Sequence, residues 1–136
     1  MSLLPPRTYT VEEANAALVE VRPLVERIVG AYANLPELQE AARGTDYKRS
    51  RPSAGPAEER AYQDAQRALQ HTELELAEDL LRLERLAVVL KDPQTGLIDF
   101  YGYRDGELVE LCWKLGEPAV EHWHRIGDGF AGRRPL

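Results

Sequence analysis

The stretch from Leu97 to Leu115, LIDFYGYRDGELVELCWKL, decides the fold because it specifies two paired strands and their register. Apolar and polar residues alternate on both sides of Asp105-Gly106, a dipeptide typical of a tight hairpin turn. Counting outward from that turn sets Asp99 directly opposite Cys112. The sequence therefore predicts an antiparallel hairpin with a defined register.

This register sorts the side chains of the two strands onto two faces. The face expected to pack on the core carries Ile98, Phe100, Val109, Leu111, Trp113 and Leu115. The other face carries Asp99, Tyr101, Tyr103, Glu110, Cys112 and Lys114. A carboxylate and the only thiol of the chain thus become cross-strand neighbours, about 5 Å apart at Cβ.

Two helical patterns precede the hairpin, and the first covers residues 10–43. It opens on a capping box, in which the side chains of Thr10 and Glu13 bond each other's backbone amides. Apolar residues then follow in steps of three and four as far as Leu35, which predicts one apolar stripe on a helix. Pro36 is expected to end the main run, with a short helix restarting to about Arg43.

A flexible loop is expected at 44–56, where Gly, Pro and Ser interrupt any helical period. The second helix covers 57–87 and is expected to return antiparallel to the first. Leu74, Leu81 and Leu86 lie off its main apolar stripe. A sheet or a partner subunit should therefore cover this second surface.

The remainder of the chain predicts strands and one short helix. Residues 88–115 are interpreted as a small antiparallel β-meander. Residues 116–136 predict a short helix, with Glu117 as its cap and Pro118 at its first position, followed by a glycine-rich tail. We therefore expect one α+β domain over residues 1–136: a long antiparallel two-helix hairpin, a small β-meander and a short C-terminal helix.

Composition narrows the classes of protein to which the chain can belong. Its 136 residues include 17 Lys and Arg against 23 Asp and Glu, a net charge of -6, whereas duplex-binding proteins usually carry a basic excess. The single Cys excludes an intramolecular disulfide. Signal-peptide and membrane-spanning patterns are missing from the sequence. We expect a cytoplasmic protein that binds neither nucleic acid nor membrane.

The chemically versatile residues gather near the end of the predicted hairpin. Asp99 and Cys112 lie shortly before Glu117 and His124. Thiolate, imidazole and carboxylate suit zinc or iron, so these four residues are the candidate metal ligands. The same groups suit acid–base chemistry or binding of a small ligand. On an unbroken helix Glu117 and His124 would lie about 10 Å apart, which is too far for both to bind one ion. Either one of them orients the other ligands without binding the metal, or Glu117 lies off the helix and folds back.

Each candidate also has a purely structural explanation. Cys112 fits a small buried apolar residue, and Asp99 fits a carboxylate that bonds the turn before it. Glu117 fits a helix cap, and His124 fits a hydrogen-bonding residue of the interior. The metal hypothesis therefore rests on their joint placement. The alternative function is a structural or interaction module, in which the helical hairpin forms a coiled-coil homodimer.

Five strings in the chain are specific when taken together: TYTVEEANAALVEVRPLVE, LKDPQTGLIDF, LCWKLGEP, the WH pair at 123–124, and GFAGRRPL. They resemble a bacterial family of unknown function, the domain-of-unknown-function family numbered 2203. The resemblance implies no established activity. It marks Asp99, Phe100, Cys112, Trp113, Gly116, Glu117, Trp123, His124 and Gly132. All four candidate ligands belong to this set, whereas Glu121 and His122 do not.

Overall fold

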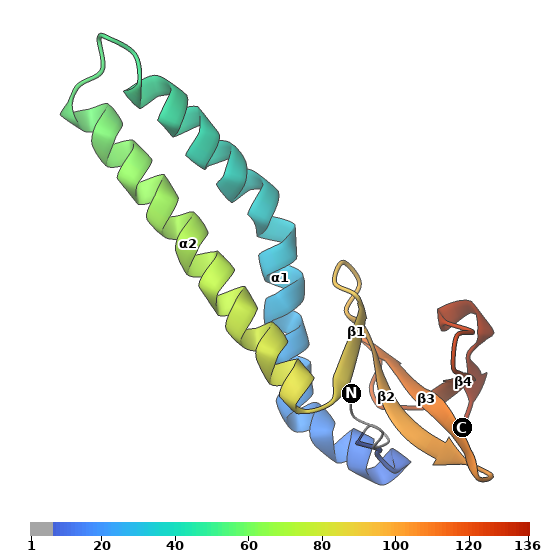
Figure 1. Ribbon diagram of the computed structural model, residues 1–136. Helices are drawn as coiled ribbons and strands as arrows, with labels where there is room; N and C mark the ends of the chain where they lie inside the picture. The colour runs from blue at the N-terminus through green and yellow to red at the C-terminus, as the bar shows by residue number, and fades with distance from the viewer. Residues whose placement is uncertain (1–6) are drawn as a thin grey trace, which may run out of the picture.

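The computed structural model describes residues 7–136 and shows two long helices beside one antiparallel sheet (Figure 1). Helix α1 spans Val11–Arg49, and α2 spans Pro56–Arg85. The sheet follows the chain in the order β1-β2-β3-β4-β5, with β1 at Val88–Asp92, β2 at Leu97–Arg104, β3 at Glu107–Lys114, β4 at His122–Arg125 and β5 at Arg134–Pro135. The predicted α+β class and the two-helix hairpin are confirmed.

Both helices begin at capping groups close to their predicted starts. Thr10 Oγ1 accepts a hydrogen bond from the Glu13 amide at 3.0 Å, and the Glu13 carboxylate accepts one from the Thr10 amide at 2.9 Å. At α2 the Glu58 carboxylate accepts a hydrogen bond from the Gly55 amide at 3.0 Å. Pro56 opens this helix, where its missing N–H leaves no bond unmade. The local sequence therefore determines where each helix starts.

The end of α1 differs from the prediction, because Pro36 does not stop the helix and residues 44–49 are helical rather than a loop. A proline inside a helix costs about 3 kcal/mol, so other contacts must hold the last turns. The Arg49 guanidinium lies 3.7 Å from the centroid of the Tyr62 ring and 3.6 Å from the Glu59 carboxylate, both on α2. These contacts join segments distant in sequence, which a local pattern does not reveal. Only residues 50–55 connect the two helices.

The β2–β3 hairpin has the predicted register, with Asp99 opposite Cys112. Its turn residues Asp105 and Gly106 have φ values of 52° and 80°, in the left-handed region that favours this dipeptide. Because side chains alternate across a strand, this register alone decides which residues of β2 and β3 share a face.

The short helix predicted to begin at Glu117, within residues 116–136, is wrong. Gly116, with φ 102°, turns the chain after β3, and residues 122–125 form β4 against the edge of β3. This pairing leaves Trp123 only 9% and His124 only 2% exposed. The burial gained by strand pairing outweighs the local capping signal of Glu117. A short helix near the C-terminus is present instead as the 3-10 turn η1 at Phe130–Gly132.

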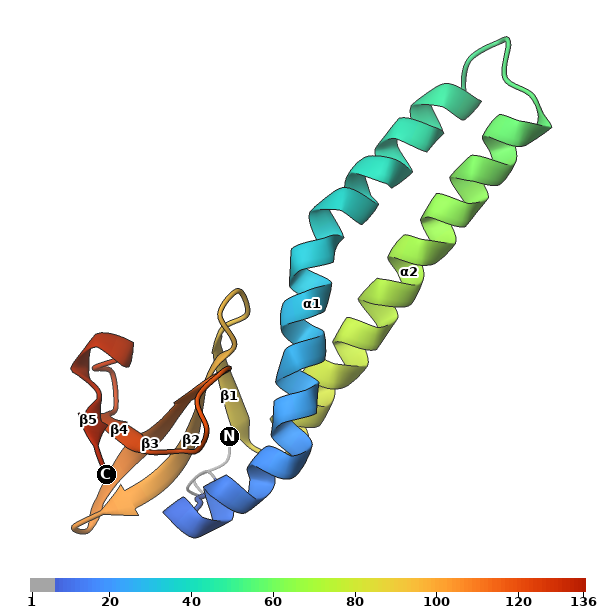
Figure 2. The same cartoon turned by 180° about the vertical axis from the view of Figure 1, so that it is seen from behind.

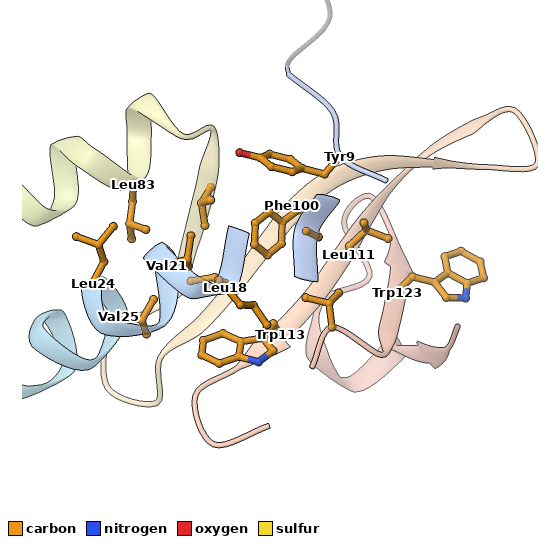
Figure 3. Packing of buried hydrophobic residues seen from close by; sticks show 14 of the residues in the cluster. Tyr9, Leu18, Val21, Leu24, Val25, Leu83, Phe100, Leu111, Trp113 and Trp123 are labelled. Atoms are coloured by element: carbon orange, nitrogen blue, oxygen red, sulfur yellow. The ribbon is translucent and has the colours of Figure 1, made fainter. Parts of the chain in front are cut away.

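The apolar core lies between one face of the sheet and the helix ends that rest on it (Figure 3). Leu18 and Val21 of α1 lie close to Phe100 and Trp113 of the sheet, and all four are at most 4% exposed. The hairpin extends well beyond the sheet (Figure 2). In the part of the chain that the structure describes, neither helix offers an apolar stretch of the length that a bilayer crossing needs.

The chain just before α1 covers the part of β2 that β1 does not reach. β1 pairs only with residues 97–100, and the Tyr9 amide donates a hydrogen bond to the Tyr101 carbonyl at 2.7 Å. The Tyr9 ring also packs edge-on against Phe100, with centroids 5.0 Å apart. Gly102 permits this approach, since a Cβ there would lie 2.8 Å from the Tyr9 carbonyl oxygen.

Candidate metal centre

Four ionisable side chains are buried on the sheet face opposite the apolar core. The exposed fractions are 2% for Asp99, 3% for Glu110, 0% for Cys112 and 2% for His124. They come from three adjacent strands, in which Asp99 lies opposite Cys112 and Glu110 lies opposite His124. Strand register thus gathers four groups that are costly to remove from water.

Three of these groups offer metal-binding atoms at close range. A carboxylate oxygen of Asp99, the sulfur of Cys112 and a ring nitrogen of His124 all lie within 4.8 Å of one another. Ligand atoms around a tetrahedral zinc ion lie about 3.3–3.8 Å apart, given metal–ligand bonds of about 2.0–2.3 Å. A contraction of about 1 Å, within the reach of side-chain rotation, would bring the three onto one ion.

The hydrogen bonds of His124 leave the correct nitrogen facing the cluster. Nδ1 lies 2.9 Å from the carbonyl oxygen of Arg125, which can only accept, so Nδ1 carries a proton and donates it. Nε2 lies 3.1 Å from Oδ1 of Asp99. In neutral imidazole Nε2 then holds the lone pair and accepts its hydrogen bond from the protonated carboxyl of Asp99. Backbone fixing of one ring nitrogen while the other faces a metal is the usual arrangement for a histidine ligand.

The protonation of Asp99 is shifted by its surroundings. Burial raises the pKa of its carboxyl to about 7, and the neighbouring Glu110 contributes to that rise. The charged form of Asp99 therefore forms less readily here than in water. A cation placed between Asp99 and His124 would reverse this effect.

Glu110 is the least satisfied member of the cluster. Its Oε2 is buried and makes no hydrogen bond among the described residues. The Lys91 ammonium lies 3.4 Å from this oxygen and 3.9 Å from Oδ2 of Asp99, as an ion pair with unfavourable hydrogen-bond geometry. Burial favours a higher pKa for the Glu110 carboxyl, but its contact with Asp99 and the charge of Lys91 hold that pKa below its ordinary value. Glu110 is thus a buried carboxylate with one oxygen still available.

Cys112 is a protonated thiol in the metal-free protein. Burial, followed by the charge of Asp99, raises the pKa of the thiol to about 11. Arg133 lies near it, with a guanidinium nitrogen 3.9 Å from the sulfur. A metal ion would have to displace the thiol proton in order to bind.

Glu117, the fourth predicted ligand, is not brought into the group. It lies in the turn after β3, where its carboxylate accepts a hydrogen bond from the Lys114 amide at 2.8 Å. The same carboxylate accepts two bonds from the Arg133 guanidinium, at 3.0 and 2.6 Å. Glu117 therefore holds Arg133 beside Cys112. The ion pair holds the pKa of the Glu117 carboxyl below its usual range.

Sequence reasoning placed Glu110 on the polar face but did not select it, and it did not consider Lys91 or Arg133 for this site. The alternation of β3 shows that Glu110 and Cys112 share a face. The proximity of Glu110 to His124 follows from the β3–β4 pairing, which the predicted helix concealed. Lys91 reaches the cluster from a bulge in β1, between Leu90 and Asp92, for which the sequence gives no clear signal.

Comparison with known proteins identifies the family but no activity. The family described as "Uncharacterized conserved protein (DUF2203)" matches residues 7–136. The chain belongs to the DUF2203 family. The resemblance drawn from the five sequence strings is therefore confirmed. No curated protein and no solved structure matches the chain, so the function of this DUF2203 protein has to be argued from its site.

Proposed function

We propose that this DUF2203 protein binds a divalent transition-metal ion, zinc or iron(II), through Asp99, Cys112 and His124. The observation that carries the proposal is the convergence of three donor atoms, all buried and within 4.8 Å of one another. A thiolate, an imidazole and a carboxylate form a mixed set that suits borderline metals rather than calcium or magnesium. Glu117 supports the set by holding Arg133 beside the sulfur.

The balance of charge supports the same proposal. With the metal bound, the Asp99 carboxylate and the Cys112 thiolate supply two negative charges, which a divalent ion neutralises. In the metal-free protein, the carboxylates of Glu110 and Glu117 are paired with Lys91 and Arg133. Without a metal, the cluster must keep protons on Asp99 and Cys112, in line with the raised pKa of each. A bound ion would offset the cost of burying these groups.

Cobalt(II) substitution tests the proposal directly. Cobalt titrated into tag-free, chelator-treated protein should give the absorption band of a thiolate-bound ion and bind at about one equivalent. Cys112→Ser should remove that band, and Asp99→Asn should weaken binding at least tenfold. The matched control is His71→Ala, because His71 is an exposed histidine on α2 that forms an ion pair with Glu75, away from the cluster. Absence of a thiolate band from the unmodified protein would exclude the proposed site.

A reduced thiol is required for this site, because oxidised sulfur is a poor metal ligand. We therefore keep the cytoplasm as the proposed location of the protein. Elemental analysis of protein purified without an affinity tag should find zinc or iron near one equivalent. Less than a tenth of an equivalent of any transition metal, with a melting temperature unchanged by chelation, would contradict the proposal.

A homodimer formed through the helical hairpin is a second candidate function, favoured by two exposed leucines of α2. Leu74 is 66% and Leu81 is 45% exposed, and their spacing of seven residues places them on one helical stripe. A coiled-coil contact with a second copy would bury both. Light scattering should then report a dimer at micromolar concentration that Leu74→Glu with Leu81→Glu converts to monomer. A monomeric unmodified protein would remove this candidate.

A further inference from the structure

The buried carboxylates of Asp99 and Glu110 share a single basic side chain. Among the lysines and arginines of residues 7–136, Lys91 alone forms ion pairs with these carboxylates. Its Nζ lies 3.9 Å from Oδ2 of Asp99 and 3.4 Å from Oε2 of Glu110. Neither contact has hydrogen-bond geometry, and Oε2 of Glu110 has no hydrogen-bond donor among the residues that the structure describes. Lys91 therefore neutralises the two carboxylates loosely, and no strong directional bond fixes its position.

Lys91 differs from the other members of the cluster in its access to water. Its side chain is 40% exposed, whereas those of Asp99 and Glu110 are 3% and 4% exposed. A lysine ammonium on a flexible stem can turn into solvent at little cost, but a buried carboxylate cannot. When a stronger cation arrives, Lys91 is the group that can move.

We propose that Lys91 is the resident counter-ion of the metal-free site, and that the entering metal ion displaces it from Glu110, which becomes the fourth ligand. This inference rests on the proposed function, since it concerns the same metal ion. Glu110 lies opposite His124 on β4 and two residues from Cys112 on β3, so its side chain is on the face that the other ligands share. Its carboxylate lies outside the group of donor atoms within 4.8 Å of one another, so Glu110 has to turn toward the ion once Lys91 leaves it. Four protein ligands would complete a tetrahedral, closed site that links β2, β3 and β4. Glu110 would add a third negative charge to those of Asp99 and Cys112, so the four-ligand site is more anionic than the three-ligand set.

The proposed exchange predicts in which direction metal affinity changes when the charge of Lys91 is removed. Lys91 opposes metal binding both by its charge and by its position at Glu110. Removing that charge should therefore tighten binding of a cation, while leaving the buried carboxylates of the metal-free protein without their partner. One substitution should thus raise metal affinity and lower metal-free stability.

The test compares Lys91→Met with Lys114→Met. Lys114 lies on the same face of β3 as Cys112, but it stacks over the Phe130 ring at 5.5 Å and forms no ion pair with either buried carboxylate. Zinc affinity is measured by competition with a chromophoric chelator. Lys91→Met should bind zinc about tenfold tighter or more, and Lys114→Met should stay within about threefold of the unmodified protein. Melting in the presence of chelator should show Lys91→Met destabilised, with zinc restoring it.

Glu110→Gln provides the second arm, since an amide oxygen is a poor substitute for a carboxylate ligand. It should lower zinc affinity at least tenfold. Lys91→Gln serves if Lys91→Met does not fold, with far-ultraviolet circular dichroism as the check on folding. The inference fails if the unmodified protein binds zinc but Lys91→Met binds no tighter than Lys114→Met, or if Glu110→Gln leaves affinity unchanged. If the unmodified protein binds neither zinc nor cobalt, the proposed function fails and this inference fails with it.

Discussion

Each face of the sheet has a buried centre, and the two centres consist of opposite chemistry. On the face that packs on the helices, Phe100 and Trp113 are fully buried. On the other face, Asp99, Cys112 and His124 are at most 2% exposed. Burial of the first set is favourable because apolar surface leaves water, whereas burial of the second is costly because ionisable groups lose hydration. Low exposure therefore does not by itself mark a residue as part of the stabilising core.

The two faces also differ in the partners that their buried side chains need. Apolar side chains need only neighbours of the right size, and α1 supplies them. The polar face needs partners of the right charge, and within residues 7–136 one oxygen of Glu110 and one ring nitrogen of His122 remain without a hydrogen bond. A face that is costly to bury and incompletely satisfied is typical of a functional site.

The largest expected effect is on the apolar face. Phe100→Ala should lower the free energy of unfolding by about 3–5 kcal/mol, because it removes a fully buried ring and its edge-on contact with Tyr9. Denaturant unfolding measures the loss. Tyr103→Ala is the control on the same strand, since Tyr103 is 59% exposed and should cost less than about 1 kcal/mol. Similar losses for both variants would mean that Phe100 is not part of the core.

The polar face should respond to pH in the opposite sense to most surface carboxylates. The pKa of Asp99 is raised to about 7 in the folded protein, well above the ordinary value of 3.8. The stability that this group contributes is therefore fully present below about pH 4 and is lost as pH rises through about 7. In chelator, Asp99→Asn should gain a few kcal/mol relative to the unmodified protein between pH 4 and pH 8. A stability difference that does not change with pH would contradict this assignment.

The rate at which the Cys112 thiol reacts tests how well the polar face is closed to solvent. Because the pKa of Cys112 is raised to about 11 and its side chain is buried, native metal-free protein should react with a thiol reagent at pH 8 at least about a hundredfold more slowly than the unfolded chain. The rate is followed by absorbance with a chromogenic disulfide, using guanidinium-unfolded protein as the reference. Native and unfolded rates within tenfold of each other would show that the polar face opens readily.

The smallest effect belongs to ion pairs at the surface, which have the same chemistry as the polar face but keep a hydrated guanidinium. Arg27 on α1 binds Asp79 on α2 through two hydrogen bonds, at 3.0 and 3.1 Å, with 56% of the Arg27 side chain and 15% of the Asp79 side chain exposed. Arg27→Gln should cost about 0.2–1 kcal/mol, and less at 1 M salt. A larger cost that salt does not reduce would indicate that this pair supports the hairpin far more than its exposure suggests.

The parts of the site that the sequence could predict are those fixed by a local turn. Asp105-Gly106 sets the β2–β3 register, and Asp99 and Cys112 follow from it by counting. His124 was correctly expected nearby, although for the wrong reason, since a strand and not a helix brings it there. The neighbours that determine the charge of the site come from pairings distant in sequence.

Glu117 shows why a ligand set is harder to predict than a register. Its carboxylate is close in sequence to the cluster, but Arg133 from the C-terminal tail binds it through two hydrogen bonds. The sequence near Glu117 gives no signal that Arg133 is its partner. In the same way, the sequence near Pro36 gives no signal of the contacts with α2 that keep α1 helical. Local patterns predicted the elements, and long-range contacts decided their ends and their partners.

The position of Tyr9 has a consequence for any shortened version of the chain. Among residues 7–136, no strand pairs with residues 101–104 of β2 on the β1 side, and the Tyr9 amide donates a hydrogen bond to the first carbonyl of this stretch. A chain that starts at α1 would expose a half-strand with free backbone groups, ready to join the same half-strand of another molecule. Such a truncation would keep both long helices and every proposed metal ligand, yet it would favour edge-to-edge aggregation.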